Sequence, residues 1–180
     1  MQTTEARTTT EKTKSLSLDD LSRMRSEELL RLYQGGKVPK SLSALDGPLT
    51  GRMLAVKKLE AGGIARRLRA FAGSRKFVWG GKTFSATNDR EGTGINRVNA
   101  PGVLGRQNLF PFTTLFASSE IDGKTAVILD YDHPENPPYI RRIHDEVREV
   151  SPGVYLGPAM WKSKERPITV LWFALDTGKR

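Results

Sequence analysis

Apolar side chains near the start of the chain recur with the spacing of a helix. Between Leu18 and Tyr33 they return every three to five residues, which is typical of an amphipathic helix. Ser17 can cap the start of this helix, and Gly35 and Gly36 can end it. Two glutamates follow Ser26, where their negative charge favours a new helix start. The pattern predicts an N-terminal helix over residues 18–34, interrupted near Ser26.

Further along, the pattern changes to short β-rich runs separated by turn residues. Asp122-Gly123 is the strongest hairpin signal, and Gly80-Gly81 is interpreted as another turn. Successive antiparallel strands close into a barrel because closure removes exposed edges. The sequence therefore predicts a mainly β protein, an antiparallel up-and-down β-barrel of 8–9 strands. The predicted strands are 51–58, 76–79, 82–86, 94–99, 110–118, 125–131, 139–150, 154–161 and 168–175.

Two segments carry a helical pattern inside this β-rich region. Residues 64–72 place apolar side chains on one face and arginines beside it, which predicts one short basic helix ended by Gly73. Residues 139–150 fit either a helix or a strand. The flanking Pro137-Pro138 and Ser151-Pro152-Gly153 resemble the neighbouring turns and favour the strand. As a strand, it places Asp145 on the same face as two apolar neighbours.

Composition limits the class of protein. The chain has 180 residues, of which 37% are hydrophobic, and contains no cysteine. We expect residues 1–16 to be a disordered tail and residues 17–180 to form a single barrel domain. The absence of cysteine excludes disulfide frameworks and thiolate metal sites. No apolar run approaches the roughly 20 residues of a membrane helix, and the polar start is unlike a secretory signal. A cytoplasmic protein without a membrane span is expected.

The net charge of +9 is concentrated in the N-terminal half, above all between Lys57 and Lys76. Such a patch can attract phosphate, anionic surfaces or nucleic acid, although a solvated helix face explains it as well. Phe71 within the patch and the adjoining Phe77 are too few aromatic residues for the base stacking that single-strand binders use. Specific nucleic-acid binding is therefore not expected.

Standard catalytic signatures are missing, so candidate sites must come from individual polar residues. The chain has no phosphate-binding loop, no dinucleotide fingerprint and no zinc-protease motif, and its two histidines are His133 and His144. We expect neither a metal nor a cofactor. Asp145 would be costly to bury on the inner face of a barrel without a cation, which Lys82, Arg97, Arg141 or Arg148 could supply.

The cavity of the predicted barrel provides the remaining candidates. Aromatic residues in the strands fill the core or line an apolar cavity, while carboxylates there could bind a ligand or move a proton. The catalytic candidates are Asp130, Asp145 and Tyr131. The candidate ligand-binding residues are Trp79, Lys82, Phe84, Arg97, Asp130, Asp145 and Tyr155.

Several short motifs support a family resemblance. They are Asp46-Gly-Pro-Leu-Thr-Gly-Arg, Trp79-Gly-Gly-Lys-Thr-Phe, Asp130-Tyr-Asp, Asp145-Glu-Val-Arg and Gly153-Val-Tyr-Leu-Gly. Together they resemble lipocalin-like (calycin) barrels, in particular small bacterial domains of unknown function with a Gly-x-Trp-x-Gly motif. The first-strand tryptophan of that motif is replaced here by Gly47-Pro-Leu-Thr-Gly. The resemblance implies a barrel for a small apolar ligand, in some cases recruited for catalysis in secondary metabolism.

The favoured function is therefore binding of a small, largely hydrophobic or acidic metabolite in the barrel, with Lys82 and Arg97 facing an acidic group of the ligand. The alternative is a cofactor-free isomerase, cyclase or hydrolase in which a barrel carboxylate transfers the proton. A weaker alternative is binding of nucleic acid or an anionic surface through residues 57–76. The sequence leaves the oligomeric state open.

Overall fold

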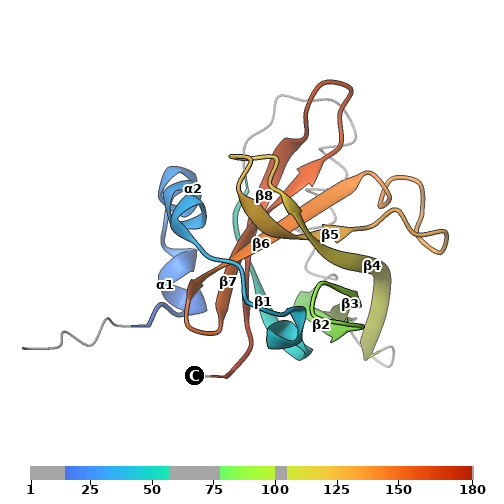
Figure 1. Cartoon of the computed structure of the whole chain (residues 1–180), viewed down its shortest axis with the longest axis horizontal. Helices are drawn as coiled ribbons and strands as arrows, with labels where there is room; N and C mark the ends of the chain where they lie inside the picture. Colours follow the sequence, from blue (N-terminus) through green and yellow to red (C-terminus); the bar gives the residue numbers. More distant parts are fainter. Residues whose placement is uncertain (1–14, 57–77, 100–104, 180) are drawn as a thin grey trace, which may run out of the picture.

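A closed antiparallel barrel forms the body of the protein (Figure 1). The computed structural model describes residues 15–56, 78–99 and 105–179. Within these ranges eight strands pair in sequence order, and β1 also pairs with β8 to close the barrel. The predicted mainly β class and up-and-down barrel are confirmed. The strands are β1 (Gly47–Val56), β2 (Val78–Ala86), β3 (Glu91–Asn99), β4 (Arg106–Ser118), β5 (Thr125–Asp130), β6 (Ile143–Ser151), β7 (Val154–Trp161) and β8 (Ile168–Asp176).

The prediction of a turn at Gly80-Gly81 is wrong. β2 runs through both glycines, and its register against β3 shifts between Trp79 and Gly81, which is the signature of a β-bulge. Gly81 adopts φ +119°, a conformation that side chains with a Cβ rarely take. The two glycines therefore bend one strand where the sequence suggested that they separate two.

The contested segment is a strand, but a shorter one than predicted. β6 begins at Ile143, whereas residues 137–142 form turns. The backbone carbonyl of Pro137 accepts hydrogen bonds from the amides of Ile140 (2.9 Å) and Arg141 (3.2 Å). Because local turn hydrogen bonds already satisfy this backbone, strand pairing starts only after it.

The N-terminal helix is divided in two, as the charge pattern near Ser26 suggested. α1 (Leu18–Ser22) begins with a capping box between Ser17 and Asp20, and α2 (Ser26–Gly35) follows after a three-residue break. A single turn of 3₁₀ helix, η1 (Leu42–Leu45), leads into β1. None of the described helices is long and apolar enough to cross a membrane.

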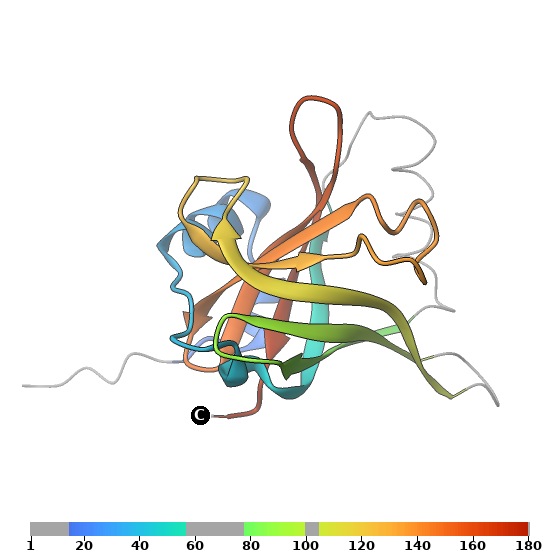
Figure 2. The same cartoon turned by 45° about the vertical axis from the view of Figure 1, so that its right-hand side comes forward.

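The two helices lie on the outside of the barrel wall, which separates two apolar cores (Figures 1 and 2). The inner core fills the barrel and includes Phe84, Phe112 and Tyr155. The outer core joins Tyr33 of α2 to Trp172 of β8, whose ring centroids are 5.8 Å apart. Strands β7 and β8 are therefore buried on both faces, which explains their nearly continuous apolar sequences.

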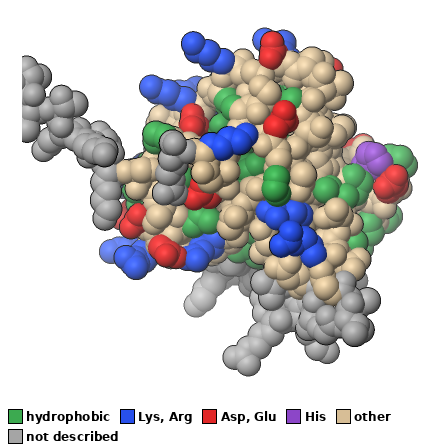
Figure 3. Space-filling view, turned by 90° about the horizontal axis from the view of Figure 1, so that it is seen from below, with side chains coloured by type: hydrophobic (Ala, Val, Ile, Leu, Met, Phe, Trp, Pro, Cys, Tyr) green, Lys and Arg blue, Asp and Glu red, His purple; other side chains and the backbone are tan. Residues whose placement is uncertain are grey.

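Some predicted segments lie outside the described residues. These are residues 1–14 of the predicted tail, the basic helix 64–72 and the whole of the basic patch between Lys57 and Lys76. Ser15 and Leu16, which the prediction included in the tail, are hydrogen-bonded to the side chain of Ser151. On the face shown in Figure 3, basic and acidic side chains of the described residues are interspersed.

A buried polar cluster lies under α2, on the outer face of β6. Glu146 is fully buried and accepts hydrogen bonds from the Ser119 hydroxyl (2.6 Å) and the Glu120 amide (3.1 Å). The imidazole of His144 lies 3.5 Å from its carboxylate. Nearby, Arg148 lies over the ring of Tyr33 and pairs with Asp122 at 2.8 Å. These polar contacts tie α2 and the β4–β5 turn to the barrel.

This cluster predicts an acid-sensitive contribution to stability. Burial raises the pKa of Glu146, but the nearby imidazole of His144 and the hydrogen bonds from Ser119 and Glu120 outweigh burial and hold the pKa below the usual 4.5. The carboxylate therefore stabilises the fold above about pH 4.5, and this contribution is lost as the pH falls through the lower, folded-state pKa. Glu146→Gln should cost about 1–3 kcal/mol at pH 7.

Urea unfolding at several pH values measures this effect. The difference in unfolding free energy between the wild type and Glu146→Gln should shrink as the pH falls from neutral toward 3. Glu120→Gln removes the same charge from an exposed neighbour and should follow the wild-type curve. A difference for Glu146→Gln that stays constant with pH would contradict the assignment.

Candidate functional site

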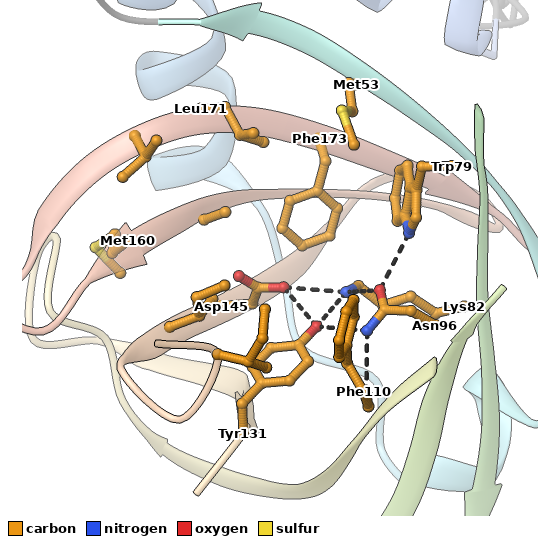
Figure 4. Close-up of a pocket in the computed structure, with 14 residues that line it drawn as sticks. Met53, Trp79, Lys82, Asn96, Phe110, Tyr131, Asp145, Met160, Leu171 and Phe173 are labelled. Atoms are coloured by element: carbon orange, nitrogen blue, oxygen red, sulfur yellow. Dashed lines mark hydrogen bonds and ion pairs between the residues drawn. The ribbon is translucent and has the colours of Figure 1, made fainter. Parts of the chain in front are cut away.

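The interior of the barrel contains a cavity of about 120 Å³ whose wall is mostly apolar (Figure 4). Every strand except β5 contributes to the wall, and Tyr131 directly follows that strand. A cluster of polar side chains occupies one side of the cavity. The lining residues are Met53, Trp79, Lys82, Asn96, Phe110, Tyr131, Ile140, Ile143, Asp145, Ala159, Met160, Val170, Leu171 and Phe173.

The bulge in β2 explains how two of these side chains reach the same cavity. In a regular strand, residues three positions apart point to opposite faces of the sheet. Trp79 and Lys82 nevertheless both line the cavity, because the register shift at Gly80 and Gly81 reverses the alternation between them. The Gly-Gly pair therefore determines the direction of the lysine.

Lys82 is 3% exposed and lies at the centre of a hydrogen-bond network. Its ammonium donates to Asn96 Oδ1 (2.9 Å), to Asp145 Oδ2 (3.0 Å) and to the hydroxyl of Tyr131. A lysine ammonium has three N–H donors, and these three contacts use all of them. Burial lowers the pKa of Lys82, while the carboxylate of Asp145 opposes that shift.

Aromatic rings surround the buried cation. The Nζ atom of Lys82 lies 5.1–5.4 Å from the ring centroids of Trp79, Phe112, Tyr131 and Phe173. Cation–π attraction and the ion pair with Asp145 together offset the cost of removing the ammonium from water.

The hydrogen-bond donors of the neutral residues in the network, Tyr131, Asn96 and Trp79, are also all bonded. The Tyr131 hydroxyl donates to Asp145 Oδ2 (2.9 Å) and accepts from Asn96 Nδ2 (3.2 Å). The same amide nitrogen donates to the carbonyl of Phe110 (3.1 Å), and Asn96 Oδ1 accepts from the indole of Trp79 (3.1 Å). Burial raises the pKa of Tyr131 well above 10.0, and the charge of Asp145 adds to the shift. Its hydroxyl therefore stays protonated and acts as a donor.

One oxygen atom of the cluster, Asp145 Oδ1, has no hydrogen-bond partner among the described residues. Asp145 is 4% exposed, and its Oδ2 accepts hydrogen bonds from both Lys82 and Tyr131. Its Oδ1 is buried and accepts none from the described part of the chain. Figure 4 shows this oxygen pointing away from Lys82, toward the side where Met160 lies. A carboxylate oxygen in an apolar surrounding requires a donor to offset its desolvation.

Of the predicted ligand-binding residues, the structure brings Trp79, Lys82 and Asp145 together at the cavity, and the catalytic candidate Tyr131 joins them. The predicted facing of Asp145 agrees with its position on the inner wall. Four basic residues were considered as the partner of Asp145, and the one that forms the ion pair is Lys82.

The other predicted residues lie elsewhere. Phe84 and Tyr155 are buried in the inner core and do not line this cavity. Arg97 donates to the backbone carbonyls of Leu49 and Gly80 and is likewise absent from the cavity wall. It follows Asn96, so strand alternation turns it to the other face.

The remaining charged candidates are on the outside as well. Asp130 is partly exposed and pairs with Lys162 at 2.8 Å. Arg148, one of the cations considered as the partner of Asp145, faces α2 as described above. His133 lies in the turn after β5. Among the described residues, no three His, Asp or Glu side chains are close enough to hold a metal ion.

Sequence reasoning missed Asn96, although it contacts three members of the network. One signal was present, because asparagine is disfavoured in the interior of a strand and its side chain then usually has a specific partner. The apolar wall formed by Met53, Phe110 and Phe173 carries no such signal. These residues are indistinguishable in sequence from those that fill the core.

The chain is similar in structure to a protein of known structure, at low sequence identity. No family model matches the chain, and the search of curated proteins found no match. One solved structure, that of a protein from Thermomonospora curvata, is similar over 85% of this chain and 87% of its own chain, with 15% sequence identity and a TM-score of 0.44.

Proposed function

We propose that this protein binds a small, largely apolar molecule in the cavity of its barrel, with the polar group of the ligand at Asp145. One observation carries the proposal: among the lining residues that the structure describes, one cluster of convergent polar side chains interrupts an otherwise apolar cavity wall. This combination is typical of small-molecule sites, in which the apolar wall provides affinity and a few polar groups provide orientation. The closed up-and-down barrel is also the architecture expected from a calycin-like fold, which we include in the proposal.

Filling the cavity tests this proposal. Ala159 lines the cavity, so Ala159→Phe should occupy ligand space. The neutral dye N-phenyl-1-naphthylamine, whose fluorescence rises in apolar surroundings, serves as the probe. The cavity is partly open, so that the phenyl ring of the dye can enter it while the naphthyl group stays at the mouth. We expect the wild type to bind it and Ala159→Phe to bind it at least about tenfold more weakly, which corresponds to about 1.4 kcal/mol.

Thr113→Phe is the matched control, since it introduces the same ring at an exposed position of β4. This variant should bind the dye as the wild type does. Equal affinity of the dye for the wild type and Ala159→Phe would place the dye elsewhere and reject the proposal. A native mass spectrum of the purified protein would show directly whether a metabolite remains bound.

A proton-transferring enzyme at the same site is the second candidate. The free Oδ1 of Asp145 favours it, because a carboxylate oxygen facing a cavity can accept a proton from a bound molecule. Tyr131, held protonated, could stabilise developing negative charge. If a metabolite copurifies, incubation in D2O followed by mass spectrometry tests this candidate. Deuterium at a carbon position, lost in Asp145→Asn, would support catalysis.

A further inference from the structure

The polar end of the cavity presents a hydrogen-bond acceptor to a ligand, while every described donor of the network is occupied. The three N–H groups of Lys82 are used within the cluster, as are the hydroxyl of Tyr131 and both amide hydrogens of Asn96. The indole N–H of Trp79 is also bonded. Asp145 Oδ1 remains as an acceptor without a partner. A ligand that complements this network must therefore supply a donor.

The charge of the cluster restricts the ligand further. The ammonium of Lys82 and the carboxylate of Asp145 are 3.0 Å apart and neutralise each other. A carboxylate or an ammonium on the ligand would enter an apolar cavity without a compensating charge, which is strongly unfavourable. A carboxylate would in addition place its oxygens against Asp145 Oδ1. A neutral donor avoids both penalties.

The dimensions of the cavity indicate the size of the enclosed group. Its volume of about 120 Å³ is comparable to the roughly 150 Å³ apolar cavity that holds benzene in another protein. Figure 4 shows Leu171 and Phe173 above the carboxylate and Met160 beside it, so that the space next to the free oxygen is walled by apolar side chains. The enclosed part of the ligand is about the size of one six-membered ring.

From these three observations we infer that the ligand carries a neutral hydrogen-bond donor, such as the hydroxyl of an alcohol or phenol, which donates to Asp145 Oδ1 while a ring-sized apolar group fills the cavity. This inference rests on the proposed binding function and specifies its ligand class. It replaces the expectation that Lys82 and Arg97 face an acidic group, because Lys82 has no free donor and Arg97 lies outside the cavity wall.

A series of probes with the same ring tests the inference on the wild-type protein. Displacement of N-phenyl-1-naphthylamine is measured for phenol, toluene, acetophenone, benzoate and benzylamine. Phenol should bind about tenfold more tightly than toluene or acetophenone, the ratio expected for one hydrogen bond to a charged acceptor. Benzoate and benzylamine should be the weakest of the five.

Asp145→Asn reverses the polarity of the cavity. The amide oxygen can keep the hydrogen bonds from Lys82 and Tyr131, which turns the amide NH2 group toward the free space. Acetophenone, which can only accept, should then gain affinity relative to phenol by about tenfold or more. Asp130→Asn is the matched control, since it removes a carboxylate outside the cavity and should leave the order of the probes unchanged.

The outcomes separate the two proposals. If neither the dye nor toluene binds at the site sensitive to Ala159→Phe, the binding function itself is rejected. If toluene binds there and acetophenone or benzoate binds more tightly than phenol, binding stands but the assigned ligand class is wrong. The wild-type series decides this even if Asp145→Asn fails to fold, which circular dichroism would reveal.

Discussion

Lys82→Met is expected to lower the free energy of unfolding by about 3–5 kcal/mol, because it leaves the carboxylate of Asp145 buried and without its cation. Methionine preserves most of the length and volume of the lysine side chain, so loss of packing contributes little. The loss should come mainly from the desolvated charge, since Asp145 is 4% exposed. Equilibrium unfolding in urea at pH 7 measures the change.

The double variant Lys82→Met/Asp145→Leu controls for this interpretation. It removes both charges and replaces them with apolar side chains, a change that in buried ion pairs is often neutral or stabilising. It should recover most of the stability lost by the single variant. Arg141→Met provides an exposed comparison, because Arg141 pairs with Asp132 at the surface, and surface pairs contribute about 0–1 kcal/mol. A loss below about 1 kcal/mol for Lys82→Met would refute the account of the buried pair.

Gly81→Ala should be the most disruptive single-methyl change in β2. At φ +119°, an added Cβ is strained, and it would overlap the carbonyl oxygen of Leu49 on the neighbouring strand. The bulge would have to open, separating β1 from β2 and turning Lys82 out of the cavity. We expect a loss of roughly 4 kcal/mol or more, together with loss of dye binding.

Gly80→Ala is the matched control for that prediction. Its Cβ would first meet the side-chain amide of Asn99 at 3.2 Å, a group that can move. The expected cost is about 1 kcal/mol or less, with dye binding retained. Thermal unfolding and dye titration on both variants make the comparison, and similar losses at the two glycines would argue against a special role for the bulge.

The strand pattern was predictable because it depends on local properties. Residues 154–161 were predicted with the observed bounds of β7, and Asp122-Gly123 marks the β4–β5 turn as expected. Where a predicted turn or strand differs from the structure, hydrogen bonds that the local pattern does not reveal determine the backbone conformation. Gly80-Gly81 has the composition of a turn, yet pairing with β3 on one side and β1 on the other holds it inside a strand. Residues 139–142 carry a strand-like pattern, but local turn hydrogen bonds satisfy their backbone.

The candidate site was predictable only where alternation or chemistry singled out a residue. Asp145 stood out because a carboxylate between Ile143 and Val147 had to be paired if the strand faced inward. Its partner could not be chosen among four cations, since Lys82 is 63 positions away and its direction depends on the bulge. Asn96 and the apolar wall could not be assigned, because which core residues border empty space depends on how all the strands pack together.

The amino-acid sequence by itself determined the β-rich class, the order of the strands and, within a strand, the position of Asp145 on the same face as Ile143 and Val147, since period-two alternation and turn residues act over a few neighbouring positions. Only the tertiary structure decided which residues meet across the barrel. The register shift at Gly81 brings Lys82 to Asp145 and Tyr131, and closure of β1 on β8 encloses them. The free oxygen of Asp145 is likewise a tertiary property, because it depends on the described donors of the network already being used by one another.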